Sequence, residues 1–585
     1  MFILQKGISM KKRILYGVAN YEEIIAENGY FVDKTRYIPE LEMIRNPVFL
    51  RPRRFGKSLW CRILECYYSI HQKDRFDELF GNTWIGNNPT RLKNAFIVLH
   101  LDFSTIELGK DVDTIRTNFN QICNGKMDGL IRRYASWFNE QVRIDFEKSA
   151  NSNLEVILRQ ASQNDLPPLY VIIDEYDNFA NQLITGHKDH LYKQLMADEG
   201  FLKTFFKLLK EGRKTGAIHN VFITGVLPIT IDELASGFNI AHFITLHPTF
   251  ENMLGFTQSE VDHLLNDIYH EYDIEPATRN QVGEVIRNQY NGYHFVDPDG
   301  EAVYNATILF YFLNWFCEFK TIPEYLTDMN LKTDLMWVRR ITGSNPDNTK
   351  EFVDRLLLYG NIEFDRTFLI SKFNMSQFFE KGFYPISFFY LGMLTRESRF
   401  MMRLPNLNMR TIFVEYFNEL HRIDVSTGYS DMMQRFVNDL DLNALFGGYW
   451  KGYVSQLPEA VFQKVNENFY RTTFYELCSR HLSPWFIWNL ERSYPKGRTD
   501  LEFVGKYSEC FAGVRMVIEF KYYSNTAFEK LKTTIDAFDL QKADTEQIAG
   551  YVEGLRGEYP EAKISQHVIY CFGNQGFRVF EVTNP

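Results

Sequence analysis

A short apolar run followed by a basic turn ending in Gly-Lys-Ser constrains the fold of this chain more than any other stretch. Val48-Phe49-Leu50 predicts a buried strand, and helical spacing begins at Ser58. Backbone N–H groups and the helix dipole favour phosphate at a helix start placed in this way. We therefore predict a phosphate-binding loop in which Lys57 reaches the β- and γ-phosphates and Ser58 ligates Mg²⁺. The nucleotide contacts expected from the loop are Arg53, Arg54, Phe55, Gly56, Lys57 and Ser58.

One position of the loop departs from the usual pattern G-x-x-x-x-G-K-[ST]. Arg51 stands where the first glycine belongs. That glycine normally permits a tight turn, so the loop alone is equally consistent with a basic surface turn that contains Gly-Lys-Ser.

A second stretch decides between these two interpretations. The apolar run 169–173 leads directly into Asp174 and Glu175. Such a run is typical of a central parallel strand, and open α/β sheets bind ligands at the carboxyl ends of their strands. We expect Asp174 to hold Mg²⁺ through water and Glu175 to polarise the attacking water, although acids after strands also serve as helix N-caps. Together with the loop, this run favours ATP hydrolysis.

The N-terminal half alternates strands with helices. Apolar runs at 96–103 and 220–225 add two strands, and Thr224 ends the second of them as an expected γ-phosphate sensor. This alternation predicts an α/β fold with a parallel sheet over residues 11–250. Residues 251–335 read as a helical lid. Residues 336–454 read as a helical region whose helix, hairpin and helix around 388–406 predict a winged helix that contacts either DNA or protein.

The C-terminal residues 455–585 carry a second pattern. Strands at 497–503 and 515–521 are joined by a hairpin at 506–513, so Asp500 and Glu519 should meet on neighbouring strands and hold Mg²⁺ or Mn²⁺. Lys521 lies on the same strand face as Glu519 and is placed to orient a metal-bound water and to stabilise phosphate charge. A cross-strand ion pair would give the same Glu-x-Lys spacing.

Two flanking helices add to this predicted site. Glu476 on an upstream helix is a further carboxylate, and Gln547 shares a helix face with Tyr551 at spacing i, i+4. An ordinary exposed glutamine is the alternative for Gln547.

Composition limits the class of protein. A chain of 585 residues is too long for one core, and 45% hydrophobic residues indicate a folded protein. The net charge of −10 argues against a general nucleic-acid binder but allows one local groove for DNA. Seven scattered cysteines and the lack of an apolar stretch of about 18 residues predict reduced thiols, a cytoplasmic location and no membrane segment.

These motifs carry a resemblance to known families. The loop F-L-R-P-R-R-F-G-K-S-L and the strand V-I-I-D-E-Y-D in residues 11–320 resemble the bacterial AAA-ATPase-like family, in which arginine is usual at the first loop position. Residues 455–585 resemble the PD-(D/E)XK nuclease superfamily, which implies a restriction-endonuclease-like α/β domain. Its acid, its E-x-K pair and its helical glutamine would correspond to Asp500, to Glu519 with Lys521, and to Gln547; Glu476 matches the first-helix acid less closely. Thr499 replaces the proline of the superfamily's name.

The leading expectation is a protein that hydrolyses ATP and cuts DNA with Mg²⁺, in a defence or mobile-element setting implied by the resemblance. The alternative is a nucleotide-switched regulator whose nuclease-like domain only binds DNA or protein. DNA versus RNA and assembly into a homo-oligomer stay open. Arg213 and Arg279 are candidates for an arginine finger by position alone.

Overall fold

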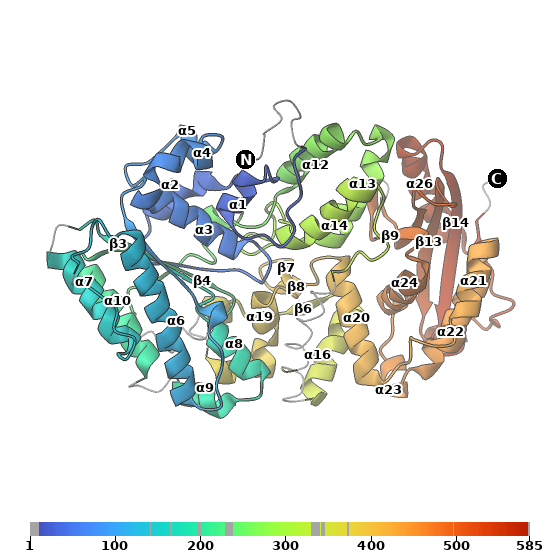
Figure 1. The fold of residues 1–585 in the computed structure, drawn as a ribbon. Helices are drawn as coiled ribbons and strands as arrows, with labels where there is room; N and C mark the ends of the chain where they lie inside the picture. Colours follow the sequence, from blue (N-terminus) through green and yellow to red (C-terminus); the bar gives the residue numbers. More distant parts are fainter. Residues whose placement is uncertain are drawn as a thin grey trace.

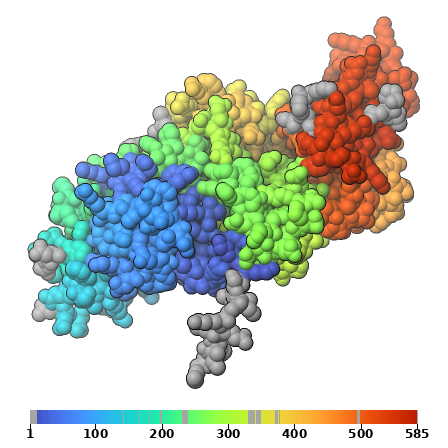
Figure 2. Space-filling view, turned by 90° about the horizontal axis from the view of Figure 1, so that it is seen from above, coloured from blue at the N-terminus to red at the C-terminus, as the bar shows by residue number. Residues whose placement is uncertain are grey.

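The computed structural model describes residues 11–582 apart from 141, 164–165, 196–199, 229–237, 329–339, 341–345, 371–373 and 495–496. Its elements follow one another across the molecule (Figure 1). A parallel sheet with flanking helices lies at one end, and a second sheet lies at the other. Helices of the middle of the chain, green to yellow, separate the two sheets, and Figure 2 shows the green residues on the surface between the blue and red parts.

The N-terminal sheet contains five parallel strands in the order β2-β3-β4-β1-β5. They are β1 (Pro47–Leu50), β2 (Ile97–Asp102), β3 (Leu169–Asp174), β4 (Ile218–Gly225) and β5 (His242–Phe243). Every residue of β1 and β3 is buried, as strands covered on both faces require. The predicted parallel α/β sheet is confirmed, and the carboxyl ends of β1, β3 and β4 lie at one edge.

Helices cover this sheet and set its binding edge. Helix α3 follows the phosphate loop and packs against β2 and β3. The helices of this part are α1 (Tyr21–Ala26), α2 (Ile38–Glu42), α3 (Lys57–Tyr68), α4 (Phe76–Phe80), α5 (Trp84–Asn87), α6 (Val112–Arg133), α7 (Ala150–Gln163), α8 (Asn178–Thr185), α9 (Asp189–Leu195) and α10 (Phe201–Thr215).

Three helices form the lid region: α12 (Gln258–Tyr272), α13 (Arg279–Tyr290) and α14 (Ala306–Phe319). A capping box starts α12, because the Thr257 hydroxyl accepts from the Glu260 N–H and the Glu260 carboxylate accepts from the Thr257 N–H. The boundary expected near residue 335 lies outside the described residues.

The next region has the element order of a winged helix. Its small antiparallel sheet has the order β6-β8-β7, built from β6 (Asn361–Glu363) and the hairpin β7 (Thr395–Arg396) and β8 (Met401–Arg403). Its helices are α16 (Pro346–Tyr359), α17 (Arg366–Ile370), α18 (Met375–Phe378), α19 (Tyr384–Tyr390) and α20 (Leu407–His421). Every residue of α19, the helix before the hairpin, is buried. That helix is therefore a packing element and has no face with which to contact DNA.

The C-terminal sheet has the order β15-β14-β13-β12-β9, with only the central pair β13–β14 parallel. The strands are β9 (Phe486–Leu490), β12 (Leu501–Gly505), β13 (Val514–Tyr523), β14 (Lys563–Phe572) and β15 (Gly576–Glu581), with a short pair β10 (Ser493–Tyr494) and β11 (Gly497–Arg498) beside them. The helices are α21 (Ser430–Asp439), α22 (Leu442–Gly452), α23 (Glu459–Phe462), α24 (Glu467–Leu482), α25 (Asn525–Lys530) and α26 (Lys542–Glu558). The second predicted α/β domain is confirmed.

Within the described part of the chain, no helix has the length and apolar character needed to cross a bilayer.

Candidate functional site

The phosphate loop makes a tight turn between β1 and α3. Arg54 and Gly56 both have left-handed backbone, with φ of 70° and 92°. Glycine adopts this conformation without steric cost, and nothing lies within 4 Å of an added Cβ at Gly56, so its backbone angle is what requires glycine. The amide groups at the start of α3 consequently face the space above the strand ends, which is the arrangement that binds phosphate.

The position of Arg51 shows why the loop does not need a glycine at its first position. Its backbone is not left-handed, and its buried guanidinium donates to the carbonyls of Leu50, Thr245, Phe250 and Glu251 at 2.8–3.2 Å. The guanidinium also lies 4.3 Å from the ring centroids of both Phe49 and Phe295. Arg51 is thus an internal cross-link between the loop and the residues that lead into the lid, and a small residue there is not needed for the turn.

A cavity of about 360 Å³ opens above the loop, within the size range of small-molecule sites. Its lining comes from the N-terminal segments 15–19 and 30–34, the loop residues 53–60, Glu175, and the lid residues 253–256 and 306–310. The Lys57 ammonium lies at its floor and donates to the carbonyls of Arg51 and Pro52 at 3.0 and 2.9 Å. Burial lowers the pKa of Lys57. A bound polyphosphate would replace these two carbonyls, as acceptors of the Lys57 hydrogen bonds, with phosphate oxygens that carry negative charge.

The acids at the end of β3 are brought to the loop as predicted. Asp174 is buried, accepts from the Ser58 hydroxyl and accepts from the Glu175 N–H at 2.9 Å. Burial raises the pKa of both Asp174 and Glu175, because a charged carboxylate is poorly solvated there. Glu175 has a strained φ of 48° and lines the cavity. The donor set of Ser58 and Asp174 is one of hard oxygens, which suits Mg²⁺.

Three other predicted residues are placed away from the cavity. The Thr224 hydroxyl donates to the Phe49 carbonyl at 2.7 Å inside the sheet, and Thr224 is absent from the cavity lining. Arg213 donates to the carbonyl of Ile218, the first residue of β4, at the sheet edge opposite the loop. Arg279 pairs with Asp262 at 3.3 Å within the lid. The structure gives none of them a role at the nucleotide cavity of its own chain.

The lid is tied to the loop through the backbone. Gly255 N–H donates to the Phe55 carbonyl, the Asn305 side chain to the Arg53 carbonyl, and Thr307 N–H to the Arg54 carbonyl, at 3.1–3.3 Å. The loop therefore contacts the start of α14 and the segment before α12 directly.

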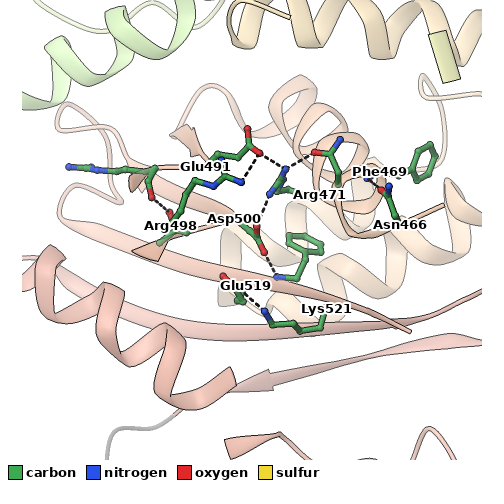
Figure 3. A network of polar contacts seen from close by, with 12 residues as sticks. Asn466, Phe469, Arg471, Glu491, Arg498, Asp500, Glu519 and Lys521 are labelled. Carbon is green, nitrogen blue, oxygen red and sulfur yellow. Dashed lines mark hydrogen bonds and ion pairs between the residues drawn. The ribbon is translucent and has the colours of Figure 1, made fainter. Parts of the chain in front are cut away.

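The second cluster lies on the C-terminal sheet (Figure 3). The antiparallel register pairs Leu501 with Ile518, which sets Asp500 opposite Glu519 at the end of β12, as the predicted hairpin required. Both carboxyl groups are buried. The Asp500 Oδ2 accepts from the Phe520 N–H at 2.8 Å, and its Oδ1 accepts from Arg471 at 2.6 Å. The two expected metal ligands therefore share one site.

Lys521 and Gln547 converge on Glu519. Its Oε1 accepts from the Lys521 ammonium at 2.9 Å and from the Gln547 amide at 2.6 Å, while Lys521 also donates to the Gln547 Oε1 at 3.0 Å. Tyr551, one turn further along α26, shares the Gln547 amide. Burial and the negative charge of Asp500 raise the pKa of Glu519. The predicted Glu-x-Lys pair and the helical glutamine thus form one hydrogen-bonded group.

The carboxylate that helix α24 brings to this site is Glu467 and not Glu476. Burial and the charge of Asp500 raise the pKa of Glu467 to about 7, and Glu467 in turn acts on Glu519 and Lys521. Glu476 lies nine residues further along α24, fully buried and paired with Arg480. A sequence signal for Glu467 did exist: Asn466 is a typical N-cap and accepts from Phe469 N–H, so an acid in the first turn was to be expected.

A divalent cation fits this cluster. Glu467, Asp500 and Glu519 offer carboxylate oxygens, which are suitable ligands for a divalent cation. The buried Glu519 Oε2 accepts no hydrogen bond from any described residue. A cation would satisfy that oxygen and offset the mutual repulsion that raises the pKa values of Glu467 and Glu519.

Arg471 is a residue that the sequence did not reveal. Besides its contact with Asp500, its guanidinium donates to Glu491 at 2.8 Å (Figure 3). Glu491 also accepts from Arg410 of α20 at 2.7 Å. These arginines lower the pKa of Glu491 to about 2, so it stays ionised. A chain of charge pairs thus joins helix α20 to the acid cluster.

Comparison with known families agrees with both clusters. Residues 15–235 match the family model described as a predicted AAA-ATPase, and residues 465–581 match a model of the PD-(D/E)XK nuclease superfamily. Comparisons with curated proteins and with solved structures gave no match. The first matched range contains the phosphate loop, Asp174 and Glu175, and the second contains Glu467, Asp500, Glu519, Lys521 and Gln547. The chain therefore combines an N-terminal region that matches the predicted AAA-ATPase model with a C-terminal region that matches the PD-(D/E)XK nuclease superfamily model.

Proposed function

We propose that this protein binds and hydrolyses ATP with Mg²⁺ in its N-terminal part and cuts DNA with a divalent cation in its C-terminal part. The observation that carries the nuclease proposal is the buried Glu519 Oε2, which lacks a donor among the described residues and lies beside a lysine and two further acids. A defence or mobile-element setting belongs to the same proposal and is supported by the fusion of the two domains.

In the N-terminal part, the chain's own residues would position the nucleotide and the water. Amide groups at the start of α3 and the Lys57 ammonium would hold the phosphates, and Ser58 and Asp174 would hold Mg²⁺, which neutralises phosphate charge. Glu175 lines the cavity and would accept a proton from the attacking water. Burial raises the pKa of Glu175, which makes the carboxylate a better proton acceptor.

In the C-terminal part, Asp500, Glu519 and Glu467 would hold Mg²⁺ or Mn²⁺, which supplies a polarised water and an electrophile at the phosphodiester. Lys521 lies 2.9 Å from Glu519 Oε1, close enough to orient such a water and to stabilise charge on the phosphate. Gln547 fixes Lys521 and Glu519 relative to one another through its two hydrogen bonds.

The experiment compares metal binding with DNA cleavage in three variants. Glu519→Gln should lose both Mn²⁺ binding by calorimetry and cleavage of a labelled duplex. Lys521→Met should retain Mn²⁺ binding and cut about 10²–10³-fold more slowly, because it removes one transition-state contact. Lys542→Met is the matched control, since Lys542 lies on α26 with its side chain 90% exposed and paired with Glu546. Cleavage by Glu519→Gln at the parent rate would overturn the proposal.

One contact favours a second candidate, a nucleotide-switched regulator whose nuclease-like domain binds DNA or protein without cutting. The Arg471 guanidinium occupies Asp500 Oδ1 at 2.6 Å, where a cation would otherwise bind. If that ion pair persists, Asp500 does not ligate metal. Arg471→Met separates the candidates: a nuclease gains Mn²⁺ affinity or keeps its cleavage, whereas the regulator shows no cleavage in either form.

A further inference from the structure

A second polar cavity, of about 370 Å³, lies where the lid, the winged-helix region and the nuclease domain meet. Its walls come from α13 and the loop after it, from the segment joining β8 to α20, and from Leu490, Glu491 and Arg498 of the nuclease domain. We call it the three-domain groove. It is separate from the nucleotide cavity, and none of the described residues lines both.

The charge of this groove is opposite to that of the chain. Four arginines line it, Arg287, Arg403, Arg410 and Arg498, against one carboxylate, Glu491. The whole chain carries a net charge of −10. Like charges gathered in this way repel one another, and a bound anion would offset that repulsion.

One of the four arginines is largely buried in an ion pair, and the other three have exposed or partly exposed side chains in the groove. Arg410 is held by Glu491 at 2.7 Å and is largely buried. Arg498 is 57% exposed and lies 3.4 Å from Glu491, and Arg287 is also exposed. No described group accepts a hydrogen bond from the Arg403 guanidinium, which is partly exposed. Guanidinium groups bind phosphate with two parallel hydrogen bonds, so these three suit phosphate oxygens.

The groove adjoins the acid cluster through one residue. Glu491 accepts from Arg471, and Arg471 donates to Asp500 (Figure 3). A DNA strand whose phosphates contact the three arginines would therefore pass close to the predicted cutting site, since the single residue Arg471 connects Glu491 of the groove to Asp500. Net positive charge beside a phosphodiester-cutting site favours the backbone of the substrate itself over any other polyanion.

We propose that the three-domain groove binds the phosphate backbone of the DNA substrate through Arg287, Arg403 and Arg498. This inference rests on the proposed nuclease function and names its substrate contact. It also gives the lid a part in substrate binding, because Arg287 belongs to α13 while Arg498 belongs to the nuclease domain.

The test measures binding of the full chain to a fluorescent 20-base-pair DNA duplex in EDTA, where cutting cannot occur, over a series of salt concentrations. Arg287→Gln, Arg403→Gln and Arg498→Gln should each reduce the slope of log affinity against log salt by about 0.9. The affinity lost between 50 and 200 mM salt should then shrink about 3.5-fold for each variant. Arg132→Gln, on α6 and 79% exposed, removes the same charge far from the groove and should leave the slope unchanged.

Two further arms keep the result interpretable. Arg403→Lys keeps the positive charge but lacks the guanidinium's paired N–H donors. It should therefore show the parent's slope of log affinity against log salt while binding DNA more weakly than the parent. Unchanged slope and affinity in the triple glutamine variant would overturn the proposal, as would an equal effect of Arg132→Gln. An RNA duplex of the same sequence that alone responds to the three arginines would overturn DNA as the ligand. Binding in EDTA is measured independently of cleavage. A chain that binds DNA in this way but does not cut it when Mn²⁺ is supplied would therefore refute the nuclease function and leave the groove proposal standing.

Discussion

Replacing Arg51 by glycine restores the usual phosphate-loop pattern, and we predict that it damages the protein. The guanidinium satisfies four carbonyl oxygens, from Leu50, Thr245, Phe250 and Glu251. The Phe250 carbonyl also accepts from the Met253 N–H at 3.3 Å, so three of the four carbonyls depend on Arg51 alone among the contacts described for these residues. A buried acceptor left without a donor costs about 1–3 kcal/mol, so even the low end gives about 3 kcal/mol for three carbonyls. The loss falls on the contact between the loop and the lid.

Native-state hydrogen exchange measures this loss locally, which matters because a chain of several domains need not unfold in one step. The reporter is the Gly255 N–H, which donates to the Phe55 carbonyl at 3.3 Å and leaves the loop when the lid opens. A loss of about 3 kcal/mol predicts exchange about 150-fold faster in Arg51→Gly. Arg45→Gly, at an exposed position just before β1, should change exchange little. Equal exchange in Arg51→Gly and the parent, or tighter ATP binding in the glycine variant, would refute the reasoning.

Three further predictions concern the two sites and the C-terminal core. Lys57→Ala should abolish phosphate release and weaken ATP binding, whereas Glu175→Gln should bind ATP normally and release phosphate at least 100-fold more slowly; parent-like turnover in either would contradict the assignment. Glu467→Gln should slow metal-dependent cleavage at least 10-fold at unchanged melting temperature, while Glu476→Gln should lower the melting temperature instead; the reverse pattern would restore Glu476 to the site. Burial lowers the pKa of His567 to about 4, so about 3 kcal/mol of stability should be lost as pH falls from about 6.5 to 4, and His567→Asn should remove that loss in denaturant titrations. Identical acid sensitivity in the two proteins would contradict it.

Features with local causes could be predicted from the sequence. The phosphate loop and the Asp174 strand follow from an apolar run and the residues beside it, and each lies where it was expected. The hairpin that pairs Asp500 with Glu519 likewise depends on alternation within some twenty residues. The i, i+4 spacing put Gln547 and Tyr551 on one helix face, where the two side chains contact each other. The expectation that Gln547 belongs with Glu519 came from the family resemblance, and the Gln547 amide donates to Glu519.

Features that depend on distant packing could not be predicted in this way. Which end of α24 faces the acid cluster is set by how the helix docks on the sheet, and either Glu467 or Glu476 was compatible with the sequence. Arg51 owes its role to residues 245–251 and Phe295, far along the chain. Thr224 had the right strand position, but its hydroxyl bonds to the neighbouring strand β1.

One reaction tests the central claim that two separate sites in this chain carry two phosphate chemistries. Supercoiled plasmid is incubated with Mg²⁺ and ATP, and both nicking and phosphate release are followed for the parent, Lys57→Ala and Asp500→Asn. We predict that the parent does both, that Lys57→Ala releases no phosphate, and that Asp500→Asn releases phosphate at the parent rate but leaves the plasmid supercoiled. Nicking by Asp500→Asn at the parent rate, or phosphate release by Lys57→Ala at the parent rate, would contradict the account.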